Sequence, residues 1–436
     1  MSNIIFNSVN KVEDFVWWRL TGFIFMMMFL LIFGYFLRKS LKIERIWVIL
    51  IIVLIGLLPA STVYVLWICV VFQGFFNLIF ASMAYFALES ARNSPKYKFH
   101  WGISASLIFI ISLFHYPPTS LIVFAFTFAY VVFADSNNWA QVKRRVILDV
   151  TFFGVSLIIY RCLERAWVTP FFFKYKMLNQ DPYYDMGLVQ NLLIKQRVLA
   201  EAFFVSFAGS FDFIFHIMGG LIGFAFVYLI VSLALIRLRS SFFVEEKRLF
   251  IERLLVCFML LVLSVLPIIL AKNVTNLTGY RFVFVSSVMA VLTLVALLRW
   301  VFEKKIFLEP WVSRFAAVFM LSCALIVSLT LSDIVRNYKK EFDYINNKLS
   351  KADLINIKYF IYIRLSHSQV LINRSLPYEY NLMIEQVHHF SPFILSACNA
   401  AGISGHSRCR VLPSSYSGQV IAKPYQLVFD PAELKR

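Results

Sequence analysis

The chain has 436 residues, of which 60% are hydrophobic and 15% are charged, and its mean hydropathy is +0.74. Average soluble domains have about 45–50% apolar and about 25% charged residues, so this composition excludes an ordinary soluble domain and indicates a polytopic membrane protein. The net charge of +18 does not indicate nucleic-acid binding, because the Lys and Arg residues fall in short loops between apolar runs.

Ten apolar runs along residues 16–331 predict about ten transmembrane helices. Six runs precede a more polar stretch at residues 161–212, and four follow it. The runs lie at about residues 16–37, 47–58, 63–88, 101–114, 121–134, 146–160, 213–236, 254–270, 282–298 and 312–331. Runs four and five are short, so they either form a tilted pair or end partway across the bilayer.

Positively charged residues alternate between the two sides of these runs. The loops after runs one, three, five, seven and nine each carry three to five Lys or Arg residues, whereas the short loops after runs two, four and eight carry none, none and two. The positive-inside rule places the first set of loops in the cytoplasm. Both termini, the 161–212 stretch and the 272–281 loop are then expected to be extracytoplasmic.

The tail after the last run has a different character. A transmembrane domain at residues 1–331 is expected to be followed by a small extracytoplasmic α/β domain at residues 332–436. Residues 336–365 have the apolar spacing of a helix, and residues 368–374 and 418–430 have the composition of strands. Cys398 and Cys409 form either a disulfide, which an outer location permits, or two free thiols.

Four carboxylates on the predicted outer face are candidate catalytic bases. Glu13 and Asp14 precede the first run, and Asp181 and Asp185 lie in the 161–212 stretch. A carboxylate at a membrane surface can deprotonate a sugar hydroxyl. The alternatives are structural, because acids at a helix N-terminus interact favourably with the helix dipole and polar loops carry acids without a catalytic role.

Polar and cationic residues on the same predicted face are candidates for substrate binding. Arginine and lysine pair well with phosphate, although a cation at a helix end can also simply reach the interface. These residues are Arg19, Arg165, Lys174, Lys272, Tyr280 and Arg281. His115, at the corner between runs four and five, is either a proton relay or an interfacial turn residue.

Ionisable residues inside or beside apolar runs are further candidates by default, because they are costly in a membrane. Asp149 belongs to this group, and so do Arg161 and Glu164, which are close enough in sequence to pair with each other. His388 and His389 have no neighbouring ligands at metal-binding spacing, so no metal and no cofactor are expected.

The layout resembles that of the bacterial polytopic glycosyltransferases of the GT-C class, and most of all the O-antigen-modifying (serotype-converting) glucosyltransferases. The resemblance covers nearly the whole chain: Glu13 and Asp14 with Arg19, Tyr280-Arg281 before a late run, and a tail that contains LPYEYNLMIEQVHHFSPFILSACNAAGI. It implies transfer of a sugar, a glucosyl group in that family, from a polyprenyl-phosphate donor to a cell-surface glycan such as O-antigen, at the bacterial inner membrane.

The sequence departs from that family in one respect and leaves other classes open. The family has a span before its acidic loop, so either a preceding span is missing here or Asp14 is not the catalytic acid. An O-antigen polymerase or ligase would share the many spans and a large basic outer loop. A transporter or flippase would predict inverted repeats and broken helices at matching positions, which the sequence does not contain.

Overall fold

The computed structural model describes residues 14–58, 72–134, 138–168, 244–266 and 283–303, three strands of the tail, and isolated positions between 61 and 347. The chain divides into two compact units. One comprises residues 22–66 and 71–324 and holds the helical bundle; the other comprises residues 1–21, 67–70 and 325–436 and holds the strands. Run ten, and all but isolated positions of run seven, lie outside the described residues.

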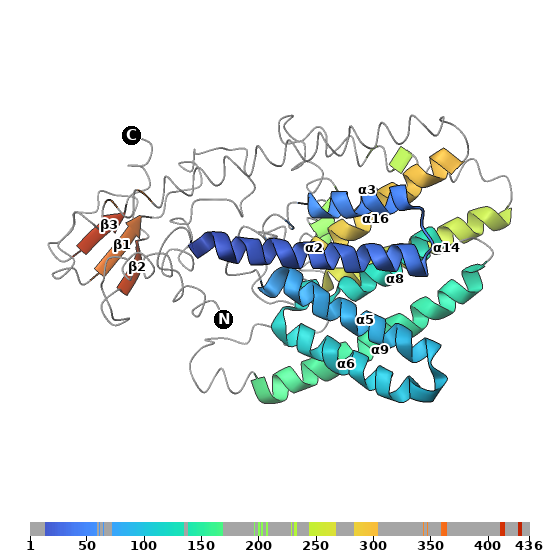
Figure 1. The fold of residues 1–436 in the computed structure, drawn as a ribbon, viewed down its shortest axis with the longest axis horizontal. Coiled ribbons are helices and arrows are strands. Elements are labelled where there is room, and N and C mark those ends of the chain that lie inside the picture. Colours follow the sequence, from blue (N-terminus) through green and yellow to red (C-terminus); the bar gives the residue numbers. More distant parts are fainter. Residues whose placement is uncertain are drawn as a thin grey trace. The chain divides into compact units, whose positions relative to one another are not determined.

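The described helices follow the apolar runs (Figure 1). Runs one and two form α2 (Asp14–Ser40) and α3 (Arg45–Gly56), and run three continues through η2 (Phe72–Phe76) into α5 (Asn77–Asn93). After η3 (Pro95–Tyr97), run four forms α6 (Lys98–His115), and run five forms α7 (Pro117–Ser120) and α8 (Ile122–Phe133). Run six forms α9 (Trp139–Leu163) with η5 (Glu164–Val168), and runs eight and nine form α14 (Val244–Ser264) and α16 (Phe284–Glu303).

The lengths of these helices confirm a helical membrane protein. Within the described residues, four helices are long and apolar enough to cross a membrane: Leu20–Ser40, Gly74–Asn93, Lys98–His115 and Trp139–Ala166. A crossing takes about 20 residues. Arg45–Gly56, Pro117–Phe133 and Phe284–Trp300 are apolar but shorter. The full count of ten spans therefore stays a prediction.

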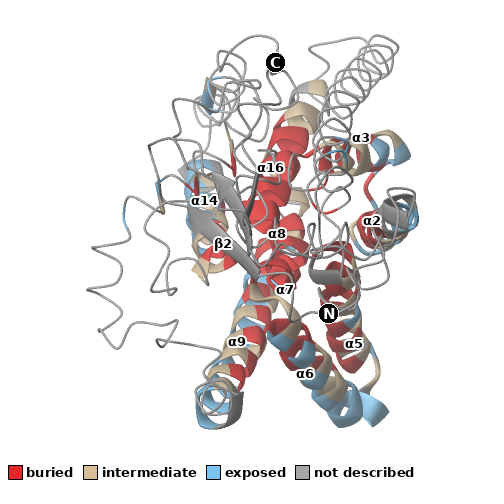
Figure 2. Cartoon of the chain, turned by 90° about the vertical axis from the view of Figure 1, so that its left-hand side faces the viewer, coloured by how far each residue is buried: buried red, intermediate tan, exposed pale blue. Residues whose placement is uncertain are grey.

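The helices of the bundle differ in how much of their surface is buried. Figure 2 shows α8 and α16 buried along most of their length, while α6 and α9 have exposed faces. The exposed face of α9 is apolar, since Ile147 and Ile158 are each 65% exposed. A continuous apolar surface of this kind is costly in water and favourable in lipid. α8 packs against α5, α9, α14 and α16, so it forms the centre around which the bundle closes.

Aromatic side chains hold α2, α5 and α8 together. The ring of Phe126 on α8 lies 4.7 Å from that of Phe36 on α2 and 4.8 Å from that of Tyr85 on α5, measured between centroids. These separations fall in the range where ring pairs add to the stabilisation from burial. The contact fixes the C-terminal half of α2 and the middle of α5 beside α8.

Two helices begin earlier than the apolar runs predict. α9 starts at Trp139 and so includes Lys143 to Arg145, and α14 starts at Val244 and so includes Lys247 and Arg248. The prediction that these cations form loops is wrong. Hydropathy marks only the part of a helix in hydrocarbon, whereas Lys, Arg, Glu and Gln favour helices and continue them into the headgroup region.

The tail contains β1 (Tyr359–Ile363), β2 (Arg410–Ser414) and β3 (Gln426–Phe429), paired in parallel in the order β2-β1-β3. β3 confirms a strand at residues 426–429 of the predicted stretch 418–430, while the rest of that stretch and residues 368–374 lie outside the described residues. The helix predicted for residues 336–365 is wrong at its end, because Tyr-Phe-Ile-Tyr-Ile consists of aromatic and β-branched residues that favour strands. The α/β domain itself stays a prediction.

Candidate functional site

The basic loops meet at one end of the bundle, which we call the basic end: residues 38–45, 89–98 and 138–149, with the adjoining ends of α14 and α16. Trp139 of α9 donates its Nε1–H to Glu252 of α14 at 2.8 Å, and the rings of Trp47 and Phe302 lie 5.6 Å apart. These contacts join α14 and the end of α16 to α9 and α3. The five loops that the sequence predicts to be cytoplasmic therefore adjoin helix ends on one side of the bundle.

The carboxylate of Glu252 accepts the hydrogen bonds that connect α14 to the basic end. Besides the bond from Trp139, its carboxylate accepts hydrogen bonds from Lys143 Nζ at 3.0 Å and from Arg248 Nε at 3.2 Å. These donors, with Trp139 the largest cause and Lys143 next, lower the pKa of Glu252 to about 2. Glu252 therefore stays ionised well below pH 4.5 and links the two helices electrostatically.

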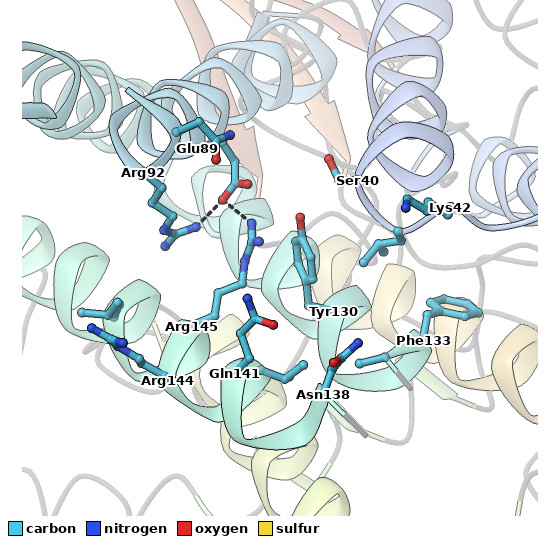
Figure 3. Close-up of a pocket in the computed structure, with 15 residues that line it drawn as sticks. Ser40, Lys42, Glu89, Arg92, Tyr130, Phe133, Asn138, Gln141, Arg144 and Arg145 are labelled. Carbon is cyan, nitrogen blue, oxygen red and sulfur yellow. Dashed lines mark hydrogen bonds and ion pairs between the residues drawn. The ribbon is translucent and has the colours of Figure 1, made fainter. Parts of the chain in front are cut away.

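A network of two acids and two arginines crosses the interior of the basic end. Glu89 lies between Arg92 and Arg145 and pairs with both (Figure 3). Arg92 also pairs with Asp149, which is fully buried and accepts a hydrogen bond from Thr127 Oγ1 at 2.9 Å. Buried charges are tolerated when they are paired and hydrogen-bonded. In this network the charges of the two acids balance those of the two arginines.

Two tyrosines hold the guanidinium of Arg145 in place. Its central carbon lies 3.4 Å from the ring centroid of Tyr130, and its Nη2 donates to the hydroxyl of Tyr85 at 3.3 Å. A guanidinium stacked on an aromatic face gains a cation–π attraction, which is larger where water is excluded. Arg145 is therefore positioned by α5 and α8 as well as by its own helix.

An open cavity of about 730 Å³ adjoins this network (Figure 3). Its polar lining contains four cations and one carboxylate: Lys42, Arg92, Arg144, Arg145 and Glu89. Ser40, Asn93, Tyr130, Asn138 and Gln141 add neutral hydrogen-bonding groups, and Leu41, Phe133, Ala134, Val142 and Leu148 add apolar surface. Arg92 and Arg145 are paired with acids, whereas Lys42 and Arg144 have no ion-pair partner in the part of the chain that the structure describes.

The turn between α2 and α3 fixes the backbone at one rim of the cavity. Arg38 Nη1 donates to the carbonyl of Ile43 at 2.9 Å, and the amide of Ile43 donates to the carbonyl of Leu37 at 3.2 Å. Within this turn Lys42 has a φ of 54°. Only glycine adopts this left-handed region without a steric cost. The two bonds to Ile43 hold the lysine in it.

The opposite end of the bundle, which we call the hydroxyl end, is built from neutral groups around the corner between α6 and α7. Asn77 Nδ2 lies within donating distance of Thr119 Oγ1 at 2.9 Å, Ser120 Oγ at 3.0 Å and the Tyr116 carbonyl at 3.0 Å. Ser112 Oγ donates to Asn77 Oδ1 at 3.0 Å. Amide and hydroxyl groups thus satisfy one another where the chain turns at Pro117.

The N-terminal end of α16 also belongs to the hydroxyl end. Phe284 packs its ring 6.0 Å from that of Phe75, and α16 contacts α7. Ser286 of α16 is within hydrogen-bonding distance, 2.6 Å, of Ser206, and both hydroxyls are buried. Ser206 belongs to the polar stretch at residues 161–212. This stretch is therefore joined to the helix that follows the 272–281 loop.

Only some of the residues singled out in the sequence are described by the structure. His115 ends α6 with its ring 6.2 Å from that of Phe76, and Arg165 is exposed in η5. Arg161 pairs with Glu164 at 2.7 Å, which confirms the pairing considered from the sequence. The side chains outside the described set are those of Glu13, Asp14, Arg19, Lys174, Asp181, Asp185, Lys272, Tyr280, Arg281, Cys398 and Cys409.

The ion network was not predicted, although Asp149 had been noted. The signal lay in two spacings: Glu89 and Arg92 are three residues apart, and Arg145 and Asp149 are four apart. Such pairs share one face of a helix. Runs three and six each carry one such pair of opposite charges at the predicted cytoplasmic end. This pattern indicates that the acid of each helix can pair with the arginine of the other.

Within the described residues, no group of three or more His, Cys, Asp or Glu side chains is arranged to hold a metal ion. Comparison of the chain with protein-family models, with curated proteins and with solved structures finds no match in any of the three.

Proposed function

We propose that this chain is an integral glycosyltransferase of the bacterial inner membrane. It moves a sugar, glucosyl by its family resemblance, from a polyprenyl-phosphate donor to a cell-surface glycan such as O-antigen. Such a donor keeps its tail in the bilayer and its phosphate at the interface. The enzyme must therefore bring membrane helices, a phosphate-binding cation and a carboxylate together at one membrane surface.

The observation that carries this proposal is the contact between Ser206 and Ser286. Ser206 belongs to the stretch that contains Asp181 and Asp185, and Ser286 lies five residues after Arg281. The candidate acids and a candidate phosphate-binding cation are thus carried by chain segments that share a buried anchor at the hydroxyl end. His115 lies at the same end, beside the corner between α6 and α7.

The proposed reaction makes one bond and breaks one bond. The acceptor hydroxyl attacks the anomeric carbon of the sugar and forms a glycosidic bond, while the bond from that carbon to the phosphate oxygen breaks. The polyprenyl phosphate leaves with the electron pair, and Arg281 with Lys272 stabilises its developing charge. One carboxylate among Glu13, Asp14, Asp181 and Asp185 accepts the proton of the hydroxyl.

Conservative substitution of the four acids tests the proposal. Purified protein in proteoliposomes would receive polyprenyl-phosphate glucose and a lipid-linked glycan, and the product would be measured by mass spectrometry. At least one of Glu13→Gln, Asp14→Asn, Asp181→Asn and Asp185→Asn should lower the rate by about 10²–10⁴-fold, the usual contribution of general-base catalysis. Arg281→Ala should lower it as well.

The exposed Asp343 provides a matched control outside the candidate set. Asp343→Asn should transfer sugar at the wild-type rate, and every variant must insert into membranes to the same extent. Undiminished transfer in all four acid variants would remove the catalytic base from the proposal. Wild-type protein that binds donor lipid without transferring sugar would favour a transporter or flippase.

A further inference from the structure

We propose a second site in this protein: the cavity at the basic end binds the phosphate headgroup of an anionic lipid. The site is separate from the proposed transfer site, because the two lie at opposite ends of α5. Asn77 begins that helix and Glu89 lies twelve residues later, which corresponds to about 18 Å along the axis. Either proposal can fail without the other.

The charge of the cavity favours an anion. Glu89 and the buried Asp149 neutralise Arg92 and Arg145 and leave Lys42 and Arg144 as excess cations around the cavity. Figure 3 shows Arg144 set apart from the Glu89 pair. Basic pockets between transmembrane helices on the cytoplasmic side are suited to anionic headgroups. The paired arginines form a fixed part of the lining, and Lys42 and Arg144, which have no ion-pair partner among the described residues, supply the positive charge for a ligand.

The depth and the apolar rim of the cavity favour a lipid over a soluble anion. Ser40 and Asn93, both in its lining, are the last residues of two candidate membrane spans, so the cavity lies at headgroup level. Leu148 also lines it and is 52% exposed, next to Ile147 on the apolar outer face of α9. The lining therefore passes from cations to a lipid-facing surface, the arrangement that an amphiphile with a charged head requires.

The backbone at Lys42 provides a separate argument. Its left-handed conformation would be free of steric cost for glycine, and the turn is closed by the bonds of Ile43. Sparsely populated conformations persist where surrounding structure enforces them, and they occur frequently at ligand sites. Here the strained position carries a cation at the rim of a basic cavity.

Lipid competition in nanodiscs tests the site with the full-length protein. Nanodiscs of phosphatidylcholine with a minority of phosphatidic acid would be compared for wild type and for Lys42→Gln/Arg144→Gln, and lipid retained on the protein would be quantified by native mass spectrometry. Loss of two interfacial cations should weaken retention of phosphatidic acid by about thirty-fold. Lys143→Gln is the matched control, because Lys143 neighbours Arg144 in sequence but pairs with Glu252 instead of lining the cavity.

The outcomes separate the possible sources of binding. Selective loss in the double variant, with the control at wild-type level and inorganic phosphate unable to compete, supports the proposal. An equal loss of phosphatidic acid from Lys143→Gln would show that the lipid responds to general surface charge, and it would overturn the proposal. Efficient competition by inorganic phosphate would show a soluble-anion site and overturn the lipid assignment. Unchanged retention in the double variant, with the protein still folded by thermal melting, would leave the cavity without this role.

Discussion

The two ends of the helical bundle bury polar groups by different means. The basic end uses charges, with Glu89 and Asp149 against Arg92 and Arg145, while the hydroxyl end uses an amide and hydroxyls around Asn77. The difference follows the distribution of Lys and Arg along the sequence. An end that must carry cations can hold some of them in its interior only by placing acids beside them.

The two means of burying polar groups suit different places in the bundle. Neutral groups are less costly to bury than ions, so they suit a corner such as the one between α6 and α7 that lies within the bundle. Charged pairs are directional and fix one helix against another more strongly. At the basic end they connect α5 to α9, and the cation–π contact on Tyr130 adds α8.

The largest expected effect comes from disrupting the buried ion network of the basic end. Asp149→Asn keeps the shape of the side chain and a partner for Thr127 but leaves Arg92 without its buried counter-charge. Removing one partner of a buried ion pair costs about 3–5 kcal/mol. The free energy of unfolding, measured in detergent with increasing denaturant, should fall by at least about 3 kcal/mol.

A second substitution separates lost charge balance from lost packing. Arg92→Met in the Asp149→Asn background removes the positive charge that Asp149 no longer balances, and Glu89 keeps Arg145 as its partner. Most of the lost stability should return, since replacing both members of a buried pair is often nearly neutral. A double variant as unstable as the single one would show that the network acts through shape and not through charge.

A smaller effect is expected at the hydroxyl end. Asn77→Ala removes the central amide, but it frees the Ser112 hydroxyl to donate to Ser120 Oγ, 2.8 Å away, and Ser120 still donates to the Tyr116 carbonyl at 2.9 Å. Hydrogen bonds inside membrane proteins average about 0.6 kcal/mol, so the loss should be about 1–2 kcal/mol. Ser82→Ala is the control, because that hydroxyl donates to the Leu78 carbonyl of its own helix and bonds no other helix among the described residues. A loss at Asn77 as large as that at Asp149 would contradict the contrast between the ends.

Much of the bundle could be predicted from hydropathy. α2, α5, α6, α9 and α16 lie where apolar runs were expected, because burial in lipid and burial in a helical core select the same residues. The short α3 and α8 show the limit of that signal. Their apolar runs indicate burial, but length decides whether a helix crosses a membrane or remains inside a bundle.

The sites were harder to predict, for a different physical reason. The ion network joins Glu89 to Arg145 across 56 residues, and the pairing depends on how α5 and α9 pack. Sequence spacing indicates which charges share a face of one helix but not which helix they meet. The strand at Tyr359–Ile363 was missed because its apolar residues also suit a helical period, and its β-branched and aromatic composition was the better guide.

The smallest expected effect concerns Glu252 at the surface of the basic end. Hydrogen bonds from Trp139 and Lys143 lower its pKa from the ordinary 4.5 to about 2, so its contribution to stability is present above about pH 4.5 and is lost as the pH falls toward 2. Wild type should therefore lose more stability than Glu252→Gln between about pH 6 and about pH 3. The difference should shrink in high salt, because Lys143 and Arg248 are exposed to solvent. Parallel pH profiles for the two proteins would show that Glu252 does not hold α14 to α9. The basic end would then depend on its buried network alone.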